Sequence, residues 1–341
     1  MTSDAVSAAA PWPTAELHVH IEGTLEADLL VELARRNDIA LPTYDVAELT
    51  ARYDRFVDLQ SFLDVYYANL AVLRTEQDFY DLTTAYLRRA HAGGVRRTEM
   101  FFDPQTHLQN GVPFEAVIGG ISSAIDDAER DLGISADLLL SFLRDLGADA
   151  AEEMFRVAMP HRDAFIGVAL DSAEVGFPPS LFEKVYAMAG AEGLHRVAHA
   201  GEEGGPEYVR EALDLLHVER IDHGNRALED LDLVARLREK RIPLTVCPLS
   251  NLALKTGPAD LREHPLRRML AEGLLVSVNS DDPAYFGGYV DDNYRAVGAA
   301  LELTDTELAT LAANSFDSAF VADEAKREYR AAVAAHLAAL A

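Results

Sequence analysis

Apolar and polar residues alternate in short runs along this chain, and most runs are followed by a stretch in which apolar residues recur every three or four positions. The alternation is typical of β-strands, and the longer period is typical of amphipathic helices. The strand-like runs lie at 16–21, 96–102, 137–143, 165–170, 195–200, 220–224, 242–247 and 274–279. Eight strands that alternate with helices predict an α/β protein with the (β/α)₈ TIM barrel fold. A doubly wound open sheet would need fewer repeats or a second domain.

The stretch at 227–240 illustrates the helical pattern. Its apolar positions Leu228, Leu231, Val234 and Ala235 fall on one face of a helix. We therefore expect one continuous helix there, with this face packed against the barrel.

Two regions exceed what a minimal barrel needs. About 75 residues separate the first two strand-like runs, which is enough for two or three helices. The clearest of these, at 54–75, is rich in aromatic residues, and we interpret it as core packing in preference to a wall or lid over the barrel mouth. Near the C-terminus, Thr304 and Glu307 have the spacing of a capping box, and 323–340 has the pattern of a closing helix.

The composition favours one large domain. A chain of 341 residues with 49% hydrophobic composition can bury a large core, and no Pro-, Gly- or Ser-rich linker divides it. We expect residues 1–13 to be a disordered lead-in and 14–341 to form a single barrel domain. The first residues lack the basic start and apolar core of a signal peptide, and no run reaches the length of a membrane span.

Charge and cysteine content restrict the partners and the compartment. A formal charge of −27 argues against nucleic acid and anionic membranes, which attract basic surfaces, and favours a small molecule or another protein. The single cysteine, Cys247, excludes a disulfide within the chain and a Cys-rich zinc site, and it suits a reducing cytoplasm. These data leave open whether the protein forms a homo-oligomer.

Candidate chemistry gathers where the predicted strands end, which is where barrel enzymes carry their active sites. Histidine and aspartate bind borderline divalent metals, and catalytic sites leave one position open for water. Each residue alone could be structural, but together they indicate one site. These residues are His18, His20, Asp171, His199, Asp222, His223, Asp281 and Asp282. We assign structural roles to the other histidines, which are His91, His107, His161, His195, His217, His264 and His336.

Five ordered motifs carry a family resemblance. They are HVHIEGT (18–24), HAGE (199–202), DHG (222–224), CPLSN (247–251) and SDDP (280–283). Their order and spacing resemble the adenosine/adenine deaminase family of metal-dependent amidohydrolases, over about residues 14 to 320. The resemblance implies a zinc-containing (β/α)₈ barrel that hydrolyses the 6-amino group of a purine and releases ammonia.

The resemblance also implies roles for individual residues. It assigns His18, His20, His199 and Asp281 as ligands of one Zn²⁺, with Fe²⁺ or Mn²⁺ as other divalent candidates. Glu202 resembles the acid that protonates a purine ring nitrogen, and His223 resembles the histidine that orients or deprotonates water. Asp282 matches the carboxylate that bonds a ring nitrogen, and we count Gly201 with the substrate-binding residues.

Elementary chemistry agrees with these roles. Zinc lowers the pKa of a bound water to about 7, which makes a nucleophile available at neutral pH. Attack on an aromatic carbon pushes electrons onto the adjacent ring nitrogen, so an acid such as Glu202 must supply a proton, and a buried carboxyl can hold one. The cytidine-type zinc deaminases use cysteine ligands, and a single cysteine excludes them.

Departures from the adenosine deaminase pattern bear on the substrate. Glu22 stands where those enzymes carry an aspartate that contacts ribose, and Glu174 stands where they carry a glycine that meets the purine. With the segments at 99–107 and 280–289, these residues resemble the adenine deaminase branch, so we expect adenine to be converted to hypoxanthine in purine salvage, with Glu22 and Glu174 as substrate-binding residues.

Other hypotheses remain. One is adenosine, a related nucleoside such as aminodeoxyfutalosine, or an N6-substituted purine as the substrate. Another is a barrel that binds a purine or a metal without catalysis. Glu22 and Glu174 could also be solvated acidic loop residues, and we interpret Asp171 and Ser172 as braces of their loop.

Overall fold

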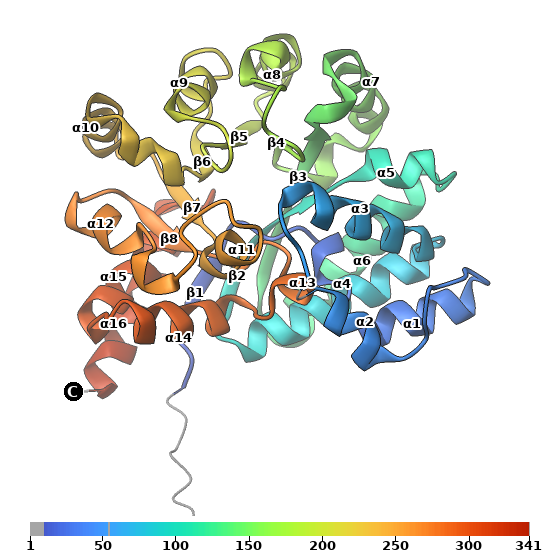
Figure 1. Ribbon diagram of the computed structural model, residues 1–341, viewed down its shortest axis with the longest axis horizontal. Coiled ribbons are helices and arrows are strands. Elements are labelled where there is room, and N and C mark those ends of the chain that lie inside the picture. Colours follow the sequence, from blue (N-terminus) through green and yellow to red (C-terminus); the bar gives the residue numbers. More distant parts are fainter. Residues whose placement is uncertain (1–9, 54, 341) are drawn as a thin grey trace, which may run out of the picture.

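In the computed structural model, eight parallel strands form one sheet in chain order and curl into a barrel (Figure 1). The structure describes residues 10–53 and 55–340, so most of the predicted lead-in at 1–13 lies outside the described residues. The strands are β1 (Thr14–Glu16), β2 (Val95–Phe102), β3 (Ser135–Leu143), β4 (Gly167–Asp171), β5 (His195–Ala200), β6 (Arg220–His223), β7 (Leu244–Val246) and β8 (Val276–Val278). Each overlaps its predicted run, which confirms the (β/α)₈ barrel.

The barrel closes where the first strand meets the last. β1 ends at Glu16, earlier than the predicted run at 16–21, and beyond it the ladder continues as isolated bridges. The amide of Asp281 donates to the carbonyl oxygen of His18, and the amide of His20 donates to the carbonyl oxygen of Asp281, each at 3.0 Å. Residues predicted to bind a metal therefore also form the backbone seam of the barrel.

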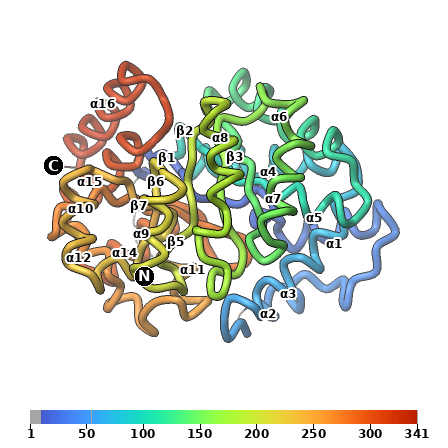
Figure 2. The backbone as a smooth tube through the Cα atoms, turned by 90° about the horizontal axis from the view of Figure 1, so that it is seen from above, coloured from blue at the N-terminus to red at the C-terminus, as the bar shows by residue number. Residues whose placement is uncertain are grey.

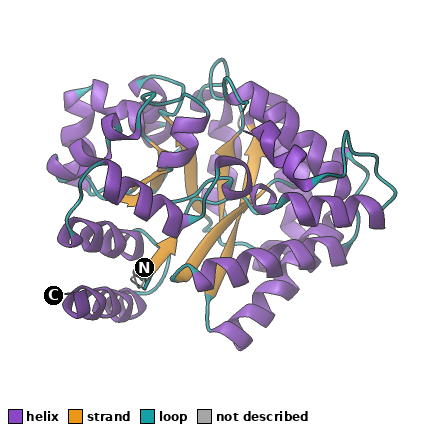
Figure 3. Ribbon diagram, turned by 60° about the horizontal axis from the view of Figure 1, so that its bottom comes forward, coloured by secondary structure: helices purple, strands orange, loops and turns teal. Residues whose placement is uncertain are grey.

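Helices surround the strands on the outside (Figures 2 and 3). Four of them, α1 to α4, stand between β1 and β2, where two or three were expected, and α16 has the predicted bounds of the closing helix and packs on α15. The helices are α1 (Ala27–Arg36), α2 (Val46–Tyr53), α3 (Leu59–Asn69), α4 (Glu76–Ala92), α5 (Pro104–Gln109), α6 (Phe114–Leu132), α7 (Ala148–Ala158), α8 (Glu183–Ala191), α9 (Pro206–Asp214), α10 (Leu231–Lys240), α11 (Pro248–Ala253), α12 (Leu266–Ala271), α13 (Pro283–Phe286), α14 (Val290–Ala300), α15 (Asp305–Asp317) and α16 (Asp323–Leu340). The capping box of Thr304 and Glu307 opens α15 as predicted.

The prediction of one continuous helix at 227–240 is wrong. A short 3₁₀ helix ends at Glu229, and α10 begins only at Leu231. Between them, the carboxylate of Asp230 accepts hydrogen bonds from two amides of the first turn of α10, which makes it the N-cap residue. Leu231 consequently points outward and is 69% exposed.

The inside of the barrel holds a charged cluster near the start of the strands. Glu99 on β2 accepts hydrogen bonds from Arg97 at 3.0 Å and from Arg220 at 2.7 Å, and all three side chains are buried. Next along β2, Phe101 belongs to a small apolar layer inside the barrel, separate from the large core under the outer helices. Among the described residues, no helix has both the length and the apolar character that crossing a membrane would require.

Candidate active site

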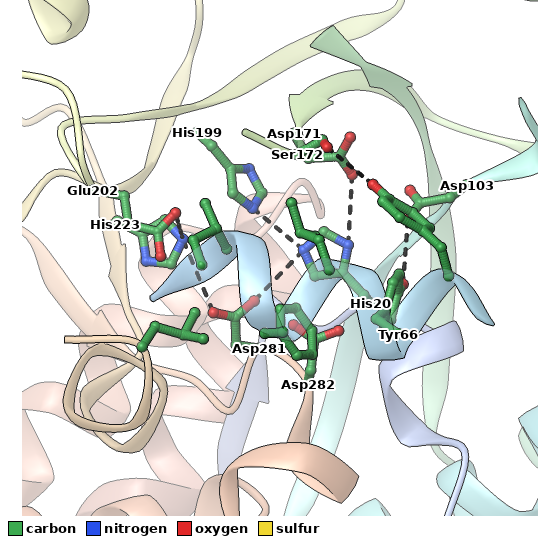
Figure 4. A pocket seen from close by; sticks show the side chains of 15 residues that line it. His20, Tyr66, Asp103, Asp171, Ser172, His199, Glu202, His223, Asp281 and Asp282 are labelled. Atoms are coloured by element: carbon green, nitrogen blue, oxygen red, sulfur yellow. Dashed lines mark hydrogen bonds and ion pairs between the residues drawn. The ribbon is translucent and has the colours of Figure 1, made fainter. Parts of the chain in front are cut away.

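A narrow cavity of about 40 Å³ opens at the carboxyl ends of the strands, where the sequence places the candidate chemistry. Asp171 and six other predicted site residues line it together, and helix α3 forms a wall (Figure 4). These six residues are His20, His199, Glu202, His223, Asp281 and Asp282. The prediction that distant motifs converge on one site therefore agrees with the positions of these side chains.

The four predicted metal ligands form a compact cluster. The donor atoms of His18, His20, His199 and Asp281 all lie within 4.8 Å of one another. Nε2 of His20 lies 3.2 Å from Nε2 of His199, and one carboxylate oxygen of Asp281 lies 3.2 Å from His18 Nε2 and 3.5 Å from His20 Nε2. Two imidazole nitrogens at this separation need a proton or a cation between them. The cluster therefore fits a divalent metal.

A polar group lies behind each of the three histidines, and behind one of them it forms a hydrogen bond. Nδ1 of His20 lies 3.5 Å from Asp171, and Nδ1 of His199 lies 3.6 Å from Asp222. Nδ1 of the third histidine lies 3.0 Å from the hydroxyl and 3.2 Å from the carbonyl oxygen of Thr245, while its buried Nε2 has no hydrogen-bond partner among the described residues. Such partners fix the ring orientation of metal-binding histidines and direct the free lone pair at the ion.

The charges of the cluster also suit metal binding. Burial lowers the pKa of His20, and it lowers the pKa of His199 well below the usual value, so both rings stay neutral with a free lone pair. Burial alone would raise the pKa of Asp281, but the nearby histidines, His18 first, outweigh burial and hold this pKa well below its usual range. Burial alone would lower the pKa of His18, but Asp281 outweighs burial and raises it. The site thus presents two neutral imidazoles and an ionised carboxylate paired with the third ring, whose proton a metal would displace.

Glu202 and His223 form an acid and base pair beside the cluster. Glu202 follows β5, His223 ends β6, and Nε2 of His223 lies 3.5 Å from a carboxylate oxygen of Glu202. Burial first, then Asp281 and Glu174, raise the pKa of Glu202 well above its usual value, so this carboxyl holds a proton at neutral pH. Burial lowers the pKa of His223 to about 3, so its ring is neutral and can accept a proton.

Three residues that line the cavity have a left-handed backbone conformation. Ser172, His223 and Asp281 have φ values of 71°, 65° and 66°, in the left-handed region that residues other than glycine rarely adopt. Each of the three lies at or just after the end of a strand and lines the cavity. Strain of this kind persists where the surrounding structure holds a side chain in a functional position.

Asp282 points into the cavity from the loop after β8. Burial first, and then Asp281, raise the pKa of Asp282 well above its usual value, so this carboxyl is protonated and can donate a hydrogen bond. The loop packs closely on the first motif, since a Cβ atom at Gly23 would lie 2.0 Å from a carboxylate oxygen of Asp282. Glycine at position 23 therefore permits the close approach of the two motifs.

The structure places Glu22 behind the cavity wall, which differs from the expected direct contact with substrate. The side chain is wholly buried, and its Oε1 atom accepts hydrogen bonds from the amide of Asp103 at 3.0 Å and from Nε2 of His107 at 2.9 Å. His107, to which we gave a purely structural role, thus orients a predicted site residue. Asp103 lines the cavity although the sequence analysis did not single it out, and its position directly after β2 was the available signal.

Glu174 and Gly201 also lie off the cavity wall, again in contrast to the expectation. The carboxylate of Glu174 accepts hydrogen bonds from the backbone amides of Gly201 at 2.8 Å, Glu202 at 3.0 Å, Glu203 at 2.8 Å and Gly204 at 2.8 Å. The amide of Gly201 is therefore engaged by this side chain, and Glu174 contacts the loop that carries the candidate acid.

Helix α3 closes one side of the cavity, so its segment is more than core packing. The hydroxyl of Tyr66 donates to Asp103 at 3.2 Å, and that of Tyr67 donates to Ser172 at 2.9 Å. These bonds tie α3 to the loops after β2 and β4. Sequence reasoning missed both tyrosines, because the aromatic content of this segment predicted burial without indicating which rings face the cavity.

A (β/α)₈ barrel whose strand ends bring together three histidines, an aspartate and a protonated carboxyl has the architecture of a metal-dependent hydrolase. A family model described as adenosine deaminase matches residues 13–336. An adenine deaminase from Sphingopyxis alaskensis is 56% identical over 324 residues, covering 95% of this chain and 94% of that protein. The chain therefore belongs to the adenosine deaminase family and is an enzyme.

Solved structures agree with this membership. The crystal structure of adenine deaminase from Arthrobacter aurescens matches with a TM-score of 0.93 and 54% identity, covering 95% of this chain and 98% of that one. An amidohydrolase from Burkholderia ambifaria, solved with bound Zn, matches with a TM-score of 0.89 and 32% identity, covering 96% of this chain and 91% of that one. The recognition from the five motifs is thus confirmed.

Proposed function

We propose that the protein hydrolyses adenine to hypoxanthine and ammonia with one zinc ion, as a step of purine salvage. The observation that carries the proposal is the pair of Glu202 and His223, 3.5 Å apart and next to the four candidate metal ligands. A protein that only bound a purine or a metal would not need this pair. Relatives named adenine deaminase at 55% to 56% identity over nearly the whole chain support adenine as the substrate.

His18, His20, His199 and Asp281 would hold the ion, which when bound supplies a Lewis acid that activates water near neutral pH. Zinc suits a donor set of imidazole nitrogens and a carboxylate oxygen, and the Burkholderia ambifaria neighbour binds Zn. Fe²⁺ and Mn²⁺ are other candidates, because their ligand preferences overlap. Elemental analysis of purified protein would decide among them.

Glu202 and His223 each carry out a part of the proton transfers. Protonated Glu202 donates to the ring nitrogen next to C6 while water adds to that carbon. Neutral His223 takes one proton from the attacking water and passes it to the amino group, which leaves as ammonia when the C6–N bond breaks. The second proton of the water, left on the new hydroxyl, returns to Glu202 as the C6=O bond forms, which restores the acid. Protonated Asp282 donates a hydrogen bond to a second ring nitrogen and so orients the base. Adenine and water are thereby converted to hypoxanthine and ammonia.

The free base is favoured over a nucleoside, because a relative and a solved neighbour are named adenine deaminase. Helix α3 closes one side of the cavity, with Leu63, Tyr66 and Tyr67 among the lining residues. Glu22 supports this side of the cavity through the amide of Asp103. We further propose a cytoplasmic location with a purine as the small-molecule partner, and we leave the homo-oligomer as a hypothesis.

Ammonia release by the zinc-loaded protein tests the proposal. We would measure it with adenine, adenosine and an N6-substituted adenine side by side, with a metal-stripped sample as control. Turnover of adenine with little turnover of adenosine is the expected result. A preference for adenosine would overturn the substrate but keep the mechanism, and no release from any of the three would favour the hypothesis of a binding protein.

A further inference from the structure

Glu174 makes an unusual set of contacts for a carboxylate beside an active site. It lies in the loop after β4, is wholly buried, and accepts hydrogen bonds from four consecutive backbone amides in the loop after β5. One carboxylate oxygen takes the amide of Gly201 and the other takes the amides of residues 202–204. The second of these four residues is Glu202, the candidate acid.

Only an ionised carboxylate meets the needs of this loop. Consecutive amides that converge form an anion-binding nest, and four buried donors require an acceptor with several lone pairs and no proton of its own. Hydrogen bonds to an ionised acceptor are also stronger than those between neutral groups. A glutamine would present an amide group to donors that already point inward, and an aspartate would be too short to reach all four.

The surrounding residues are adapted to this contact. Gly201 adopts a φ of 76°, which turns the chain so that the following amides converge. A Cβ atom at Gly204 would lie 2.9 Å from a carboxylate oxygen of Glu174 and 2.7 Å from the ring of Tyr208. Arg144, also buried, donates to the carbonyl oxygens of His199 at 2.8 Å and Phe177 at 2.9 Å, and so ties the end of β5 to the loop of Glu174.

We propose that Glu174 is a positioning residue, which holds the loop at 201–204 so that Glu202 faces the reacting ring, and that it does not contact the purine itself. The choice of assay substrate rests on the proposed function, but the positioning role does not. The ionised carboxylate also acts at a distance, since Glu174, after burial and Asp281, contributes to the raised pKa of Glu202. Glu174 therefore supports both the placement and the protonated state of the acid.

The variant Glu174→Gln tests the role, with Glu211→Gln as its matched control. Glu211 also accepts a hydrogen bond from a backbone amide, that of Ser180, but this amide lies in the 3₁₀ helix Pro179–Phe182 and not in the loop at 201–204. For Glu174→Gln we expect kcat for adenine to fall roughly 10- to 100-fold, because a small misplacement of a catalytic group has effects of this size. KM should stay within about threefold, since no interaction with the base is lost. In the pH profile of kcat, the fall on the alkaline side should begin at a lower pH in Glu174→Gln than in the wild type. Glu211→Gln should match the wild type in all three quantities.

Two results would overturn the proposal. A kcat within twofold of the wild type with an unmoved alkaline limb would remove the positioning role. A higher KM at unchanged kcat would mean that Glu174 contacts the purine directly. If Glu174→Gln fails to fold, Gly204→Ala provides the second variant, because its new Cβ atom displaces the same carboxylate, and the same kinetic changes are expected.

A measurement without substrate separates this proposal from the proposed function. In amide hydrogen exchange, residues 201–204 should lose protection in Glu174→Gln and keep it in Glu211→Gln, at equal zinc content. Unchanged protection in Glu174→Gln would refute the role of Glu174 whatever the enzyme acts on. If the wild type does not deaminate adenine, the proposed function fails, while loss of protection at 201–204 would still support the positioning of this loop.

Discussion

The proton on Glu202 is the most consequential feature at the scale of single residues. The carboxyl is buried beside Asp281, and both conditions disfavour a second negative charge. Replacing Glu202 by glutamine keeps the shape but removes the acidic proton. We expect Glu202→Gln to retain its metal and to lose turnover by about 10² to 10⁴, the usual contribution of a general acid. Metal analysis and ammonia release measure the two quantities. Normal turnover of Glu202→Gln would mean that Glu202 is not the general acid. The control is Glu207→Gln, at an exposed position, which should keep normal turnover.

The pH dependence follows from the same proton. Because the pKa of Glu202 is raised, the carboxyl is protonated at neutral pH and loses its proton only as the pH rises through that raised value. We therefore expect kcat/KM to be level near neutrality and to fall on the alkaline side. A rate profile over pH 6 to 10, at constant metal content, checks this. A rate that rises with pH over this range would mean that the ionised form is active.

The sequence predicted where the candidate metal ligands and the candidate acid lie better than where Glu22 and Glu174 lie. His18, His20 and His199 lie on or next to strands, so the pleat and the strand ends determine where they point. Glu22 and Glu174 lie in loops, where the direction of a long side chain depends on the donors that neighbouring loops supply. Those donors are backbone amides, which a residue pattern does not reveal.

Among the elements, α3 has the clearest functional consequence. The hydrogen bond from Tyr67 to Ser172 holds the helix against the cavity. Removing one hydroxyl should weaken this closure by about 1 kcal/mol, so we expect Tyr67→Phe to raise KM for adenine about fivefold, with a smaller change in kcat. Steady-state kinetics check this. The control is Tyr44→Phe, which loses an exposed hydrogen bond to Ile39 and should behave as the wild type. An unchanged KM in Tyr67→Phe would mean that the hydrogen bond to Ser172 does not affect binding of adenine.

The predicted strands are right in number and order, and the errors in the predicted elements have local causes. The alternation of 16–21 continues past Glu16, but the backbone there turns to pair with Asp281, which ends the regular ladder of β1. Apolar residues do recur with a helical period over 227–240. The carboxylate of Asp230, however, accepts hydrogen bonds from the first amides of α10, so a new helix begins there and the stretch is not one continuous helix. Periodicity does not detect such side chain to backbone bonds.

For the whole molecule, the charged cluster inside the barrel affects stability. Glu99 pairs with Arg97 and Arg220, and all three are buried. Glu99→Gln would remove the buried anion that the two guanidinium groups share and leave them only Asp137, which is partly exposed, and Asp222 at 3.9 Å. We therefore expect the free energy of unfolding to fall by about 3 kcal/mol. Urea denaturation measures this, with exposed Glu129→Gln as control. A loss below 1 kcal/mol would contradict the expectation.

The pH dependence of this stability has a definite sign. Burial alone would raise the pKa of Glu99, but Arg220 and Arg97 outweigh burial and lower it below the usual value. The contribution of the carboxylate is therefore present above its unfolded pKa and is lost as the pH falls through its lower folded pKa. The wild type should lose more stability in acid than Glu99→Gln does.

The closure of the barrel between β1 and β8 has a consequence for how the enzyme folds during its synthesis. Two of the four candidate ligands, His18 and His20, are synthesised shortly after β1, whereas Asp281 follows only after all eight strands have been synthesised. A nascent or truncated chain without β8 would carry all three histidines and still lack both the carboxylate and the backbone bonds that close the ring. We therefore expect the complete candidate site to form only once β8 has joined the barrel.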